Sequence, residues 1–275
     1  MSTPLNRRLA AEFLGTALLV LFGPGSVVAA LKVGDGKLDY GSLGFTGLAF
    51  GIVIALVVYG FGAVSGAHIN PAVTFTLAVT RRFSWRESIP YVLAQLCGGA
   101  AGGLLVVAIF SRDAVKLGGV GSTVLADNVS YLSGVTAEAL GTFILVFAIM
   151  AVAVDPRAPK GWAGLMIGLA VALSIVVVGP LTGSSLNPAR TFGPYLASAL
   201  FGGSPPWNEF WLYWVGPFVG GAAAALVYDL VAQPRQAAVD VGAAQSSPAG
   251  QAREVVGDIV AAHSSPAAWG RGDSR

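Results

Sequence analysis

Long apolar segments dominate this chain, and six of them are long enough to cross a membrane as helices. A bilayer has a hydrocarbon core about 30 Å thick, which a helix of about 20 apolar residues spans. Only 11% of the residues are charged, whereas about a quarter are charged in a typical soluble domain. The composition therefore predicts a membrane protein with several spans. The expected spans are Leu9–Leu31, Ser42–Phe61, Ile89–Phe110, Gly134–Val154, Gly161–Gly179 and Asn208–Val231.

Positively charged residues predict how these spans are oriented. They gather in the N-terminus, in the second and fourth connections and in the C-terminal segment, whereas the first and third connections have few. Basic connections stay on the cytoplasmic side, so both termini are expected in the cytoplasm. The basic residues assigned to that side are Arg7, Arg8, Arg81, Arg82, Arg86, Arg157, Lys160 and Arg235.

The remaining composition narrows the class of protein further. Residues 233–275 are rich in Ala, Ser, Gly, Gln and Pro, so we expect a disordered cytoplasmic tail after a membrane domain of residues 1–232. The net charge of +2 gives no indication of nucleic-acid binding. The single cysteine, Cys97, excludes an internal disulfide framework, and its apolar surroundings predict a buried structural thiol.

The chain also contains one pattern twice, over residues 9–110 and 134–231. Three expected spans fall in each copy, and because three is odd, the second copy enters the membrane from the opposite side. This arrangement is an inverted repeat. The matching segments are "AAEFLGTALLVLFG" (10–23) with "TAEALGTFILVFAI" (136–149), "GLAFGIVIAL" (47–56) with "GLMIGLAVAL" (164–173), "SGAHINPAVTF" (65–75) with "TGSSLNPARTF" (182–192) and, more weakly, "AQLCGGAAGG" with "YWVGPFVGGA".

Each copy carries the tripeptide Asn-Pro-Ala inside apolar surroundings, at residues 70–72 and 187–189. Asn is a strong helix N-cap and Pro fits the first helical position, so each tripeptide predicts the start of a helix. The stretches that follow, Asn70–Thr80 and Asn187–Ser198, span only about half of the membrane at about 1.5 Å per residue. We therefore expect an all-α membrane protein with six transmembrane helices and two re-entrant half-helices whose starts meet near the midplane.

The loops before the half-helices predict a water-filled path. Non-helical backbone at membrane depth is tolerated only where it is buried or lines a wet cavity. Two positive helix N-termini and the amides of Asn70 and Asn187 would converge on this path, which favours neutral hydrogen-bonding solutes over cations and protons. The carbonyl groups expected along it belong to Gly66, Ala67, His68, Gly183, Ser184 and Ser185.

These motifs together resemble the aquaporin, or major intrinsic protein, family from Leu9 to about Val231. The resemblance rests on both Asn-Pro-Ala boxes, on the paired "AE-x-LGT" segments and on "YWVGP" in the last span. It implies a passive channel in the cell membrane, a homotetramer with one pore in each subunit, and no cofactor. The boxes comprise Asn70, Pro71, Ala72, Asn187, Pro188 and Ala189, and the apolar pore wall implied by the resemblance comprises Leu19, Ile54, Leu145 and Val171.

The resemblance also implies a selectivity filter on the outer side, formed by Phe50, Ile175, Ser184 and Arg190. Arg190 stands where the first copy has Val73, and a guanidinium at membrane depth is a functional candidate by default. Water-selective members typically place His where this chain has Ile175, and this combination resembles some archaeal aquaporins. Thr191 and the pair Tyr213 and Trp214 are typical of water channels rather than glycerol facilitators. We expect a water channel with some permeability to small neutral solutes, and a facilitator of glycerol or other small solutes is the alternative.

Two carboxylates within the expected spans, Glu12 and Glu138, need an explanation because a charge at the bilayer centre costs about 2.5–3.5 kcal/mol. Proton coupling would make the chain a secondary transporter, a class that also has inverted repeats. The alternative is that each carboxylate accepts backbone N–H groups from one irregular loop. Their matching positions in the two copies, and the role of the matching glutamates in aquaporins, favour this structural role.

The other candidates are weaker. His68 could sense pH, but Ser185 occupies the matching position in the second box, which favours a role in loop packing. We find no metal-binding cluster, phosphate loop or nucleophile–base pair in the sequence, so an enzyme is the least favoured class.

Overall fold

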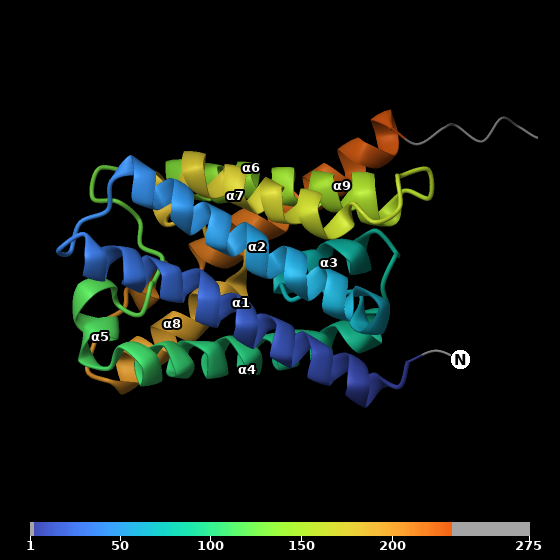
Figure 1. Ribbon diagram of the computed structural model, residues 1–275. Coiled ribbons are helices and arrows are strands. Elements are labelled where there is room, and N and C mark those ends of the chain that lie inside the picture. The colour runs from blue at the N-terminus through green and yellow to red at the C-terminus, as the bar shows by residue number, and fades with distance from the viewer. Residues whose placement is uncertain (1–2, 233–275) are drawn as a thin grey trace, which may run out of the picture. The chain divides into compact units, whose positions relative to one another are not determined.

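The structure is a computed structural model that describes residues 3–232. This part of the chain is helical throughout and contains no strand (Figure 1). The expected tail, Arg235 included, lies outside the described residues. Within residues 3–232, six helical segments are long and apolar enough to cross a membrane. They contain α1 (Leu5–Val33), α2 (Tyr40–Ser65), α4 (Trp85–Phe110), α6 (Tyr131–Ile149) with the π-helix η1 (Met150–Val154), α7 (Ala163–Thr182), and η2 (Trp207–Glu209) with α9 (Leu212–Val231).

Most of these helices extend beyond the expected apolar spans by about one turn. The reason is visible at α2, which begins at Tyr40 rather than Ser42. Asp39 caps the helix by accepting a hydrogen bond from the Ser42 backbone N–H (2.7 Å), and the Ser42 hydroxyl is 2.9 Å from the Asp39 backbone N–H. Polar capping residues thus add helical turns that an apolar segment does not reveal.

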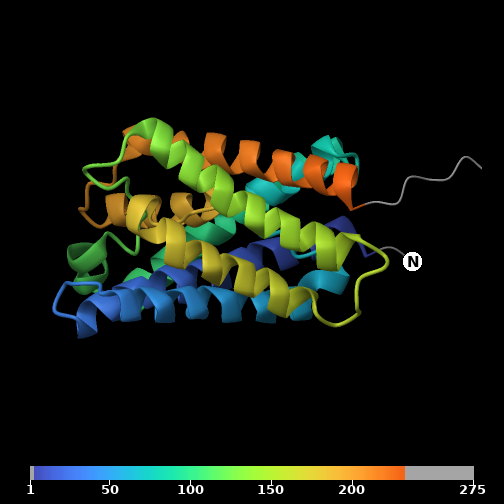
Figure 2. The same cartoon turned by 90° about the horizontal axis from the view of Figure 1, so that it is seen from above.

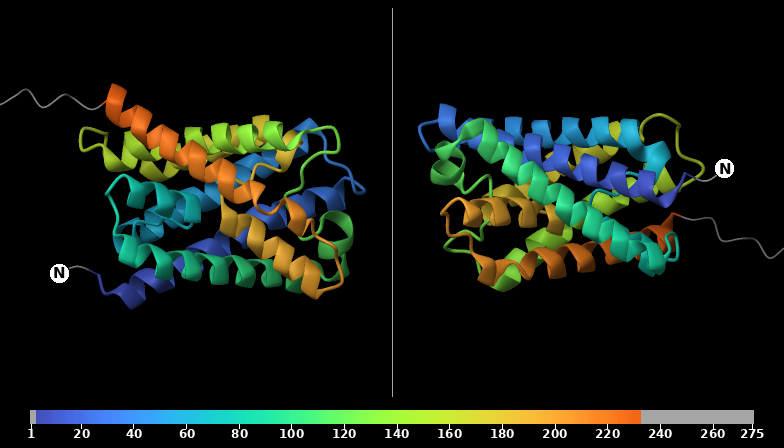
Figure 3. Two further views of the ribbon diagram at one scale, coloured as in Figure 1. Left: turned by 180° about the vertical axis from the view of Figure 1, so that it is seen from behind. Right: turned by 90° about the horizontal axis from the view of Figure 1, so that it is seen from below.

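The two expected half-helices are present as α3 (Pro71–Val79) and α8 (Pro188–Leu200). They lie in opposite halves of the bundle, as Figure 1 and the two views of Figure 3 show. Helix α1 and its repeat partner α6 run in opposite directions, as an inverted repeat requires. Figure 2 shows α7 between α2 and α6.

Helices α2 and α7 approach each other through glycines. A Cβ atom on Gly51 would lie 2.9 Å from the carbonyl oxygen of Gly168, and a Cβ on Gly168 would in turn collide with the Gly51 carbonyl. Between α4 and α8, a Cβ on Gly193 would collide with the Gly99 carbonyl, and a Cβ on Gly99 would collide with the Ala189 carbonyl. Small residues let the helix backbones come this close, which brings the two repeats together.

The expected pairing of the third spans is wrong by three residues. A side chain on Gly98 would collide with the backbone of Phe13, the residue after Glu12. A side chain on Gly220 would collide with the backbone of Ala139, the residue after Glu138. Gly98 therefore corresponds to Gly220, whereas the sequence match aligned it with Pro217. Both segments are rich in small residues, so several registers match almost equally well.

Three short elements and one side chain differ from expectation. The sequence did not indicate α5 (Arg112–Gly118), η1 or η2. Cys97, expected to be buried, is exposed on the surface of α4. Its neighbours Gly98 and Gly99 face the other helices instead, and the apolar character around Cys97 belongs to a surface that suits lipid or another subunit.

Candidate functional site

The first loop of the site is attached to the carboxylate of Glu12. One carboxylate oxygen accepts from the Ser65 hydroxyl (2.7 Å) and from the His68 backbone N–H (3.0 Å). The other accepts from the Ile69 backbone N–H (2.7 Å) and from the Gln95 amide (2.8 Å). Glu12 is completely buried, and these four donors replace the water that it would otherwise bind.

Glu138 holds the second loop in the same way. Its carboxylate accepts from the Thr182 hydroxyl (2.6 Å) and from the backbone N–H groups of Ser185 (2.8 Å) and Leu186 (2.7 Å). It is also completely buried. The backbone hydrogen bonds expected of the two glutamates are therefore present in both copies.

Several residues that complete these loops were missed from the sequence. Ser65 and Thr182 each lie five residues before an Asn of a box, and both hydroxyls reach a glutamate. Tyr91 donates to the Ser65 carbonyl (2.9 Å), and Tyr213 donates to the Thr182 carbonyl (3.0 Å). Each tyrosine lies seven residues before the glycine that contacts α1 or α6, a repeated spacing that the corrected register reveals.

The backbone of both loops adopts the left-handed conformation at matching positions. Ala67 and Ile69 have φ angles of 49° and 44°, and Ser184 and Leu186 have φ angles of 47° and 57°. Such angles are uncommon for residues with a side chain and cost about 1–3 kcal/mol each. The buried glutamates supply the hydrogen bonds that hold the loops in this shape.

Asn70 and Asn187 cap the half-helices and also connect them. The side-chain oxygen of Asn70 accepts from the Ala72 N–H (2.8 Å), and that of Asn187 accepts from the Ala189 N–H (3.0 Å). The Asn70 amide donates to the Leu186 carbonyl (2.8 Å), and the Asn187 amide donates to the Ile69 carbonyl (2.8 Å). Each half-helix is thereby tied to the loop of the other copy.

A cavity of about 230 Å³ extends from these asparagines along one half of the bundle. An amide has two N–H donors, so each asparagine that contacts this cavity can offer one more donor to a solute. The cavity brings together all four residues of the expected apolar wall and the whole first loop. Of the residues that the sequence predicted, the cavity lining includes Leu19, Ile54, Leu145, Val171, Gly66, Ala67, His68, Asn70 and Asn187.

His68 is a packed side chain within this loop. Its ring lies 4.7 Å from the Phe83 ring and 5.3 Å from the Tyr91 ring, measured between centroids. Its Nδ1 is 3.1 Å from the Thr74 hydroxyl. This environment is consistent with the loop-packing interpretation.

The four expected filter residues lie on four different segments: α2, α7, the second loop and α8. All are buried, with exposed fractions of 2–3%. The guanidinium carbon of Arg190 lies 5.0 Å from the centre of the Phe50 ring, a cation–π distance. Arg190 Nη1 donates to the Gly121 carbonyl (2.9 Å). Ile175 lies buried on α7, near the backbone of Gly47 on α2.

Two polar atoms of the filter residues lack a partner. Within the described residues, Arg190 Nε and the Ser184 hydroxyl form no hydrogen bond, although both are buried. Buried polar atoms are almost always satisfied by protein or water. Unpaired atoms of this kind are therefore unusual in a folded protein. Across residues 3–232, no group of three or more His, Cys, Asp and Glu side chains is arranged to hold a metal ion.

The fold and site define a class: a multi-pass membrane channel with two half-helices whose N-termini meet inside the bundle. Comparison with known proteins identifies the family. The sequence model of the family described as "Major intrinsic protein" matches residues 1–228. The chain belongs to this family, and it is thus a passive channel for water and small solutes rather than an enzyme.

Similar proteins come from archaea, plants and a protozoan. The chain is 46% identical to the probable aquaporin AqpM of Archaeoglobus fulgidus, with 85% of this chain and 100% of that protein covered. It is 45% identical to aquaporin AqpM of Methanothermobacter marburgensis, over 82% of this chain and 96% of that protein. A solved structure, the aquaglyceroporin from Plasmodium falciparum, matches with a TM-score of 0.75 and 25% identity, over 83% of this chain and 97% of that one.

Proposed function

We propose that this chain is primarily a water channel that also passes glycerol and similar small neutral solutes. The observation that carries the proposal is the reciprocal tie of Asn70 and Asn187 at the meeting point of the half-helices. It holds two helix N-termini and two free amide N–H donors together. A neutral solute with a lone pair can bind there, whereas a cation meets the positive ends of both helices.

The residues of the filter support a dual preference. Phe50, Ile175, Ser184 and Arg190 form the selectivity filter in this proposal. Arg190 Nε and the Ser184 hydroxyl supply one polar side, and the Phe50 ring beside the guanidinium supplies an apolar side. A polyol has hydroxyl groups on one face and CH groups on the other, so Ile175 favours its entry more than a polar residue would. The names of the relatives, aquaporin and aquaglyceroporin, include both kinds of channel.

Stopped-flow light scattering on purified protein in liposomes tests this function. We expect fast water efflux with a low activation energy, together with glycerol uptake above that of empty liposomes. Fast water flux without glycerol flux would limit the function to water. If neither flux exceeded that of empty liposomes, the open-channel proposal would be wrong.

Coupled transport is disfavoured by the environment of the two glutamates. Glu12 and Glu138 accept hydrogen bonds from neutral N–H and O–H donors on both carboxylate oxygens and have no exposed surface. A proton-coupling carboxylate needs access to a proton path, and these two hold loops instead. Flux that follows an imposed proton gradient would contradict this interpretation.

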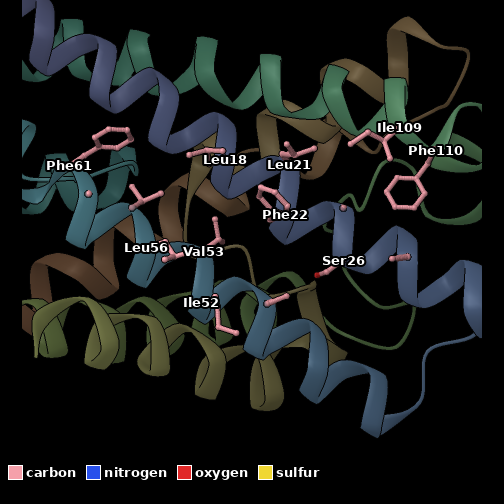
Figure 4. A pocket seen from close by; sticks show the side chains of 15 residues that line it. Leu18, Leu21, Phe22, Ser26, Ile52, Val53, Leu56, Phe61, Ile109 and Phe110 are labelled. Carbon is pink, nitrogen blue, oxygen red and sulfur yellow. The ribbon is translucent and has the colours of Figure 1, made fainter.

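We further propose that the chain forms a homotetramer with one pore in each subunit. Helices α1 and α2 border an apolar groove of about 750 Å³ (Figure 4). On α6, Leu140, Ile144 and Phe147 follow the spacing of a helical stripe and are 39–62% exposed. In this proposal the stripe of one copy inserts into the groove of the next; such a head-to-tail contact forms a ring when the rotation between successive copies closes. The labelled lining of the groove comprises Leu18, Leu21, Phe22, Ser26, Ile52, Val53, Leu56, Phe61, Ile109 and Phe110.

A disulfide trap tests this contact. In a Cys97→Ser background, the double variant Phe22→Cys and Ile144→Cys should form cross-linked dimers, trimers and tetramers under mild oxidation, whereas either single variant should form at most dimers. Native mass spectrometry should give the mass of four chains. A monomer mass, with no cross-linked ladder, would overturn the proposal.

We also propose that the protein resides in the cell membrane with both termini in the cytoplasm. The two ends of the described chain lie at the same end of the bundle (Figure 1). Arg8, Arg82 and Arg157 lie at helix ends or in connections there and form ion pairs with Glu87, Asp229 and Asp155. Labelling of single cysteines introduced at Arg81 and Asp127 should reach the first only from inside and the second only from outside. The opposite pattern would invert the orientation.

A further inference from the structure

The segment of residues 119–126, here called the filter strap, has an unusual backbone beside the filter. It follows α5 and leads toward α6. Gly119, Val120 and Gly121 have φ angles of 53°, 64° and 73°. A β-branched residue such as valine rarely adopts a positive φ, and such strain persists only where the surroundings enforce it. Val120 is completely buried among apolar side chains.

The strap holds one carbonyl against the filter. The Gly121 carbonyl accepts from Nη1 of Arg190 (2.9 Å). On its other side, any side chain on Gly121 would collide with the backbone of Pro24 in α1. Gly121 therefore packs against α1 while its carbonyl binds the guanidinium.

Anchors from the second repeat keep the strap in place. The Tyr195 hydroxyl donates to the Thr123 carbonyl (2.8 Å). The Leu125 N–H donates to the Glu209 carboxylate (3.1 Å), and the Ala126 N–H donates to the Leu181 carbonyl (3.0 Å). Besides the Gly121 carbonyl, the strap contacts the first turn of α8 through the side chain of Thr123, which reaches the Thr191 hydroxyl.

That connection is a chain of hydrogen-bonded hydroxyl groups in which each hydroxyl donates to the next. The Ser185 hydroxyl donates to the Asn187 carbonyl (2.8 Å), so it accepts from Thr191, 2.6 Å away. Because the Thr191 hydroxyl donates its hydrogen bond to Ser185, it accepts from the Thr123 hydroxyl, 2.9 Å away. A hydroxyl has only one proton to donate, so Thr123 is the donor that begins the chain. Thr191 directly follows Arg190.

We propose that Thr123 is a positioning residue for selectivity: its hydroxyl locks the strap to the first turn of α8, so that the Gly121 carbonyl fixes the Arg190 guanidinium in the filter. The inference rests on the proposed role of Arg190 and adds a residue that lies outside the filter. Thr123 is completely buried and acts through Gly121 and Arg190 rather than by touching the solute.

The glycerol-to-water permeability ratio in liposomes tests this role, because a ratio does not depend on how much protein is active. Thr123→Val keeps the shape and removes the donor. It should raise the ratio about fivefold, the effect of one neutral hydrogen bond of about 1 kcal/mol. Thr123→Ser keeps the donor and should retain the wild-type ratio. Thr142→Val is a matched control, since Thr142 is a buried threonine on α6 whose hydroxyl has no partner within residues 3–232.

A double-variant cycle separates the inference from the proposed function on which it rests. Arg190→Val alone should raise the ratio, and adding Thr123→Val to it should change nothing more, because Thr123 acts through Arg190. An unchanged ratio in Arg190→Val would contradict the filter itself. A changed ratio in Arg190→Val with none in Thr123→Val, or additive effects in the double variant, would overturn the positioning role alone. An equal rise of the permeability ratio in Thr123→Val and Thr123→Ser would also overturn it.

Discussion

At the scale of single residues, the most informative atoms are the polar ones that the protein leaves unpaired. Folded proteins pair almost every buried polar group, and this chain does so even for Glu12 and Glu138. Arg190 Nε and the Ser184 hydroxyl are exceptions that lie in the proposed filter. Among the unpaired buried side-chain atoms of residues 3–232, these two belong to the proposed filter, whereas those of Thr76, Gln95 and Thr142 do not.

Ile175 allows a direct test of what sets the solute range. Ile175→His adds a donor and a larger polar ring to the proposed filter. We expect glycerol flux to fall by about tenfold or more while water flux changes by less than about threefold, because a mismatched polar contact costs a larger solute about 1–3 kcal/mol. Stopped-flow measurements of both solutes check this. An equal loss of both would place the filter elsewhere.

The loop-anchoring glutamates make a second residue-scale prediction. Glu138→Gln replaces one acceptor oxygen with an NH₂ group, which then faces either the Ser185 or the Leu186 N–H donor. Hydrogen bonds to charged groups contribute about 1.5–3 kcal/mol each, so the unfolding temperature in detergent should fall by several degrees and water permeability should drop. Glu12→Gln should behave similarly. If flux were lost at an unchanged unfolding temperature, the glutamates would have a role beyond holding the loops.

At the scale of helices, close packing between the repeats keeps the filter residues in register. Gly51 directly follows Phe50 in α2, and Gly168 lies about two turns before Ile175 in α7. Gly168→Ala would press a methyl group onto the Gly51 carbonyl. Overpacking of this kind costs about 1–3 kcal/mol, so the variant should unfold at lower temperature and show an altered permeability ratio.

Gly44→Ala is the matched control for this substitution. Gly44 also lies in α2, but a Cβ atom added there would have nothing within 4 Å. The substitution should leave the permeability ratio unchanged and preserve or raise the unfolding temperature, since alanine favours helix more than glycine does. Equal effects of both substitutions would show that close packing at Gly168 is not the cause.

The sequence predicted the helices where residue type dictates structure. Asn-Pro-Ala predicts a cap and a first turn, and α3 and α8 begin there. It did not predict η1, because nothing in the composition of Met150–Val154 distinguishes a π-helix from an α-helix. The repeat offers an explanation afterwards: Met150 lies twelve residues after Glu138, and Pro24 lies twelve after Glu12. The second copy thus has a wider turn where the first copy has a proline inside a continuous α1, a residue without a backbone N–H to donate.

The site residues also divide into those that the sequence could predict and those that it could not. Glu12 with Glu138 and Asn70 with Asn187 could be predicted because identical residues stand at matching positions of the two copies, whereas Ser65 with Thr182 differ in residue type and were missed. Gln95 could not, since the corrected register matches it with Pro217, which has no side-chain amide, and Gly121 could not, since it contacts the site only through its backbone carbonyl. Long-range contacts of this kind depend on how the helices cross, and a single sequence does not contain that information.

At the scale of the whole molecule, an ion cluster joins the connection after η1 to the end of α9. The Asp155 carboxylate accepts from Arg157 and from the Tyr228 hydroxyl (2.7 Å), and Arg157 also donates to the Ala232 carbonyl (2.7 Å). Hydrogen bonds from Arg157 and Tyr228 hold the pKa of Asp155 well below its usual range. The cluster ties the fourth connection to the last described residue beside the wider turn of η1.

The lowered pKa gives a pH dependence with a definite sign. The folded state prefers the ionised carboxylate, so its stabilising effect is complete above the unfolded pKa of about 3.9 and is lost as the pH falls below it. Asp155→Asn should therefore unfold at lower temperature than the wild type at pH 6–8, and the difference should shrink towards pH 3. Thermal unfolding across this range checks the prediction. Asp127→Asn, at an exposed aspartate before α6, should show no such difference; a constant difference for Asp155→Asn would contradict the assignment.

The crossed ties between Asn70 and Leu186 and between Asn187 and Ile69 have a consequence for how such a molecule could originate. Neither half completes the hydrogen bonds of its own asparagine, because the carbonyl that accepts from the asparagine amide belongs to the other half. A gene encoding only one half would yield a functional channel only if its copies inserted into the same bilayer in both orientations and paired as antiparallel dimers. Fusion of two such genes would fix one of each orientation in a single polypeptide, after which each half could diverge.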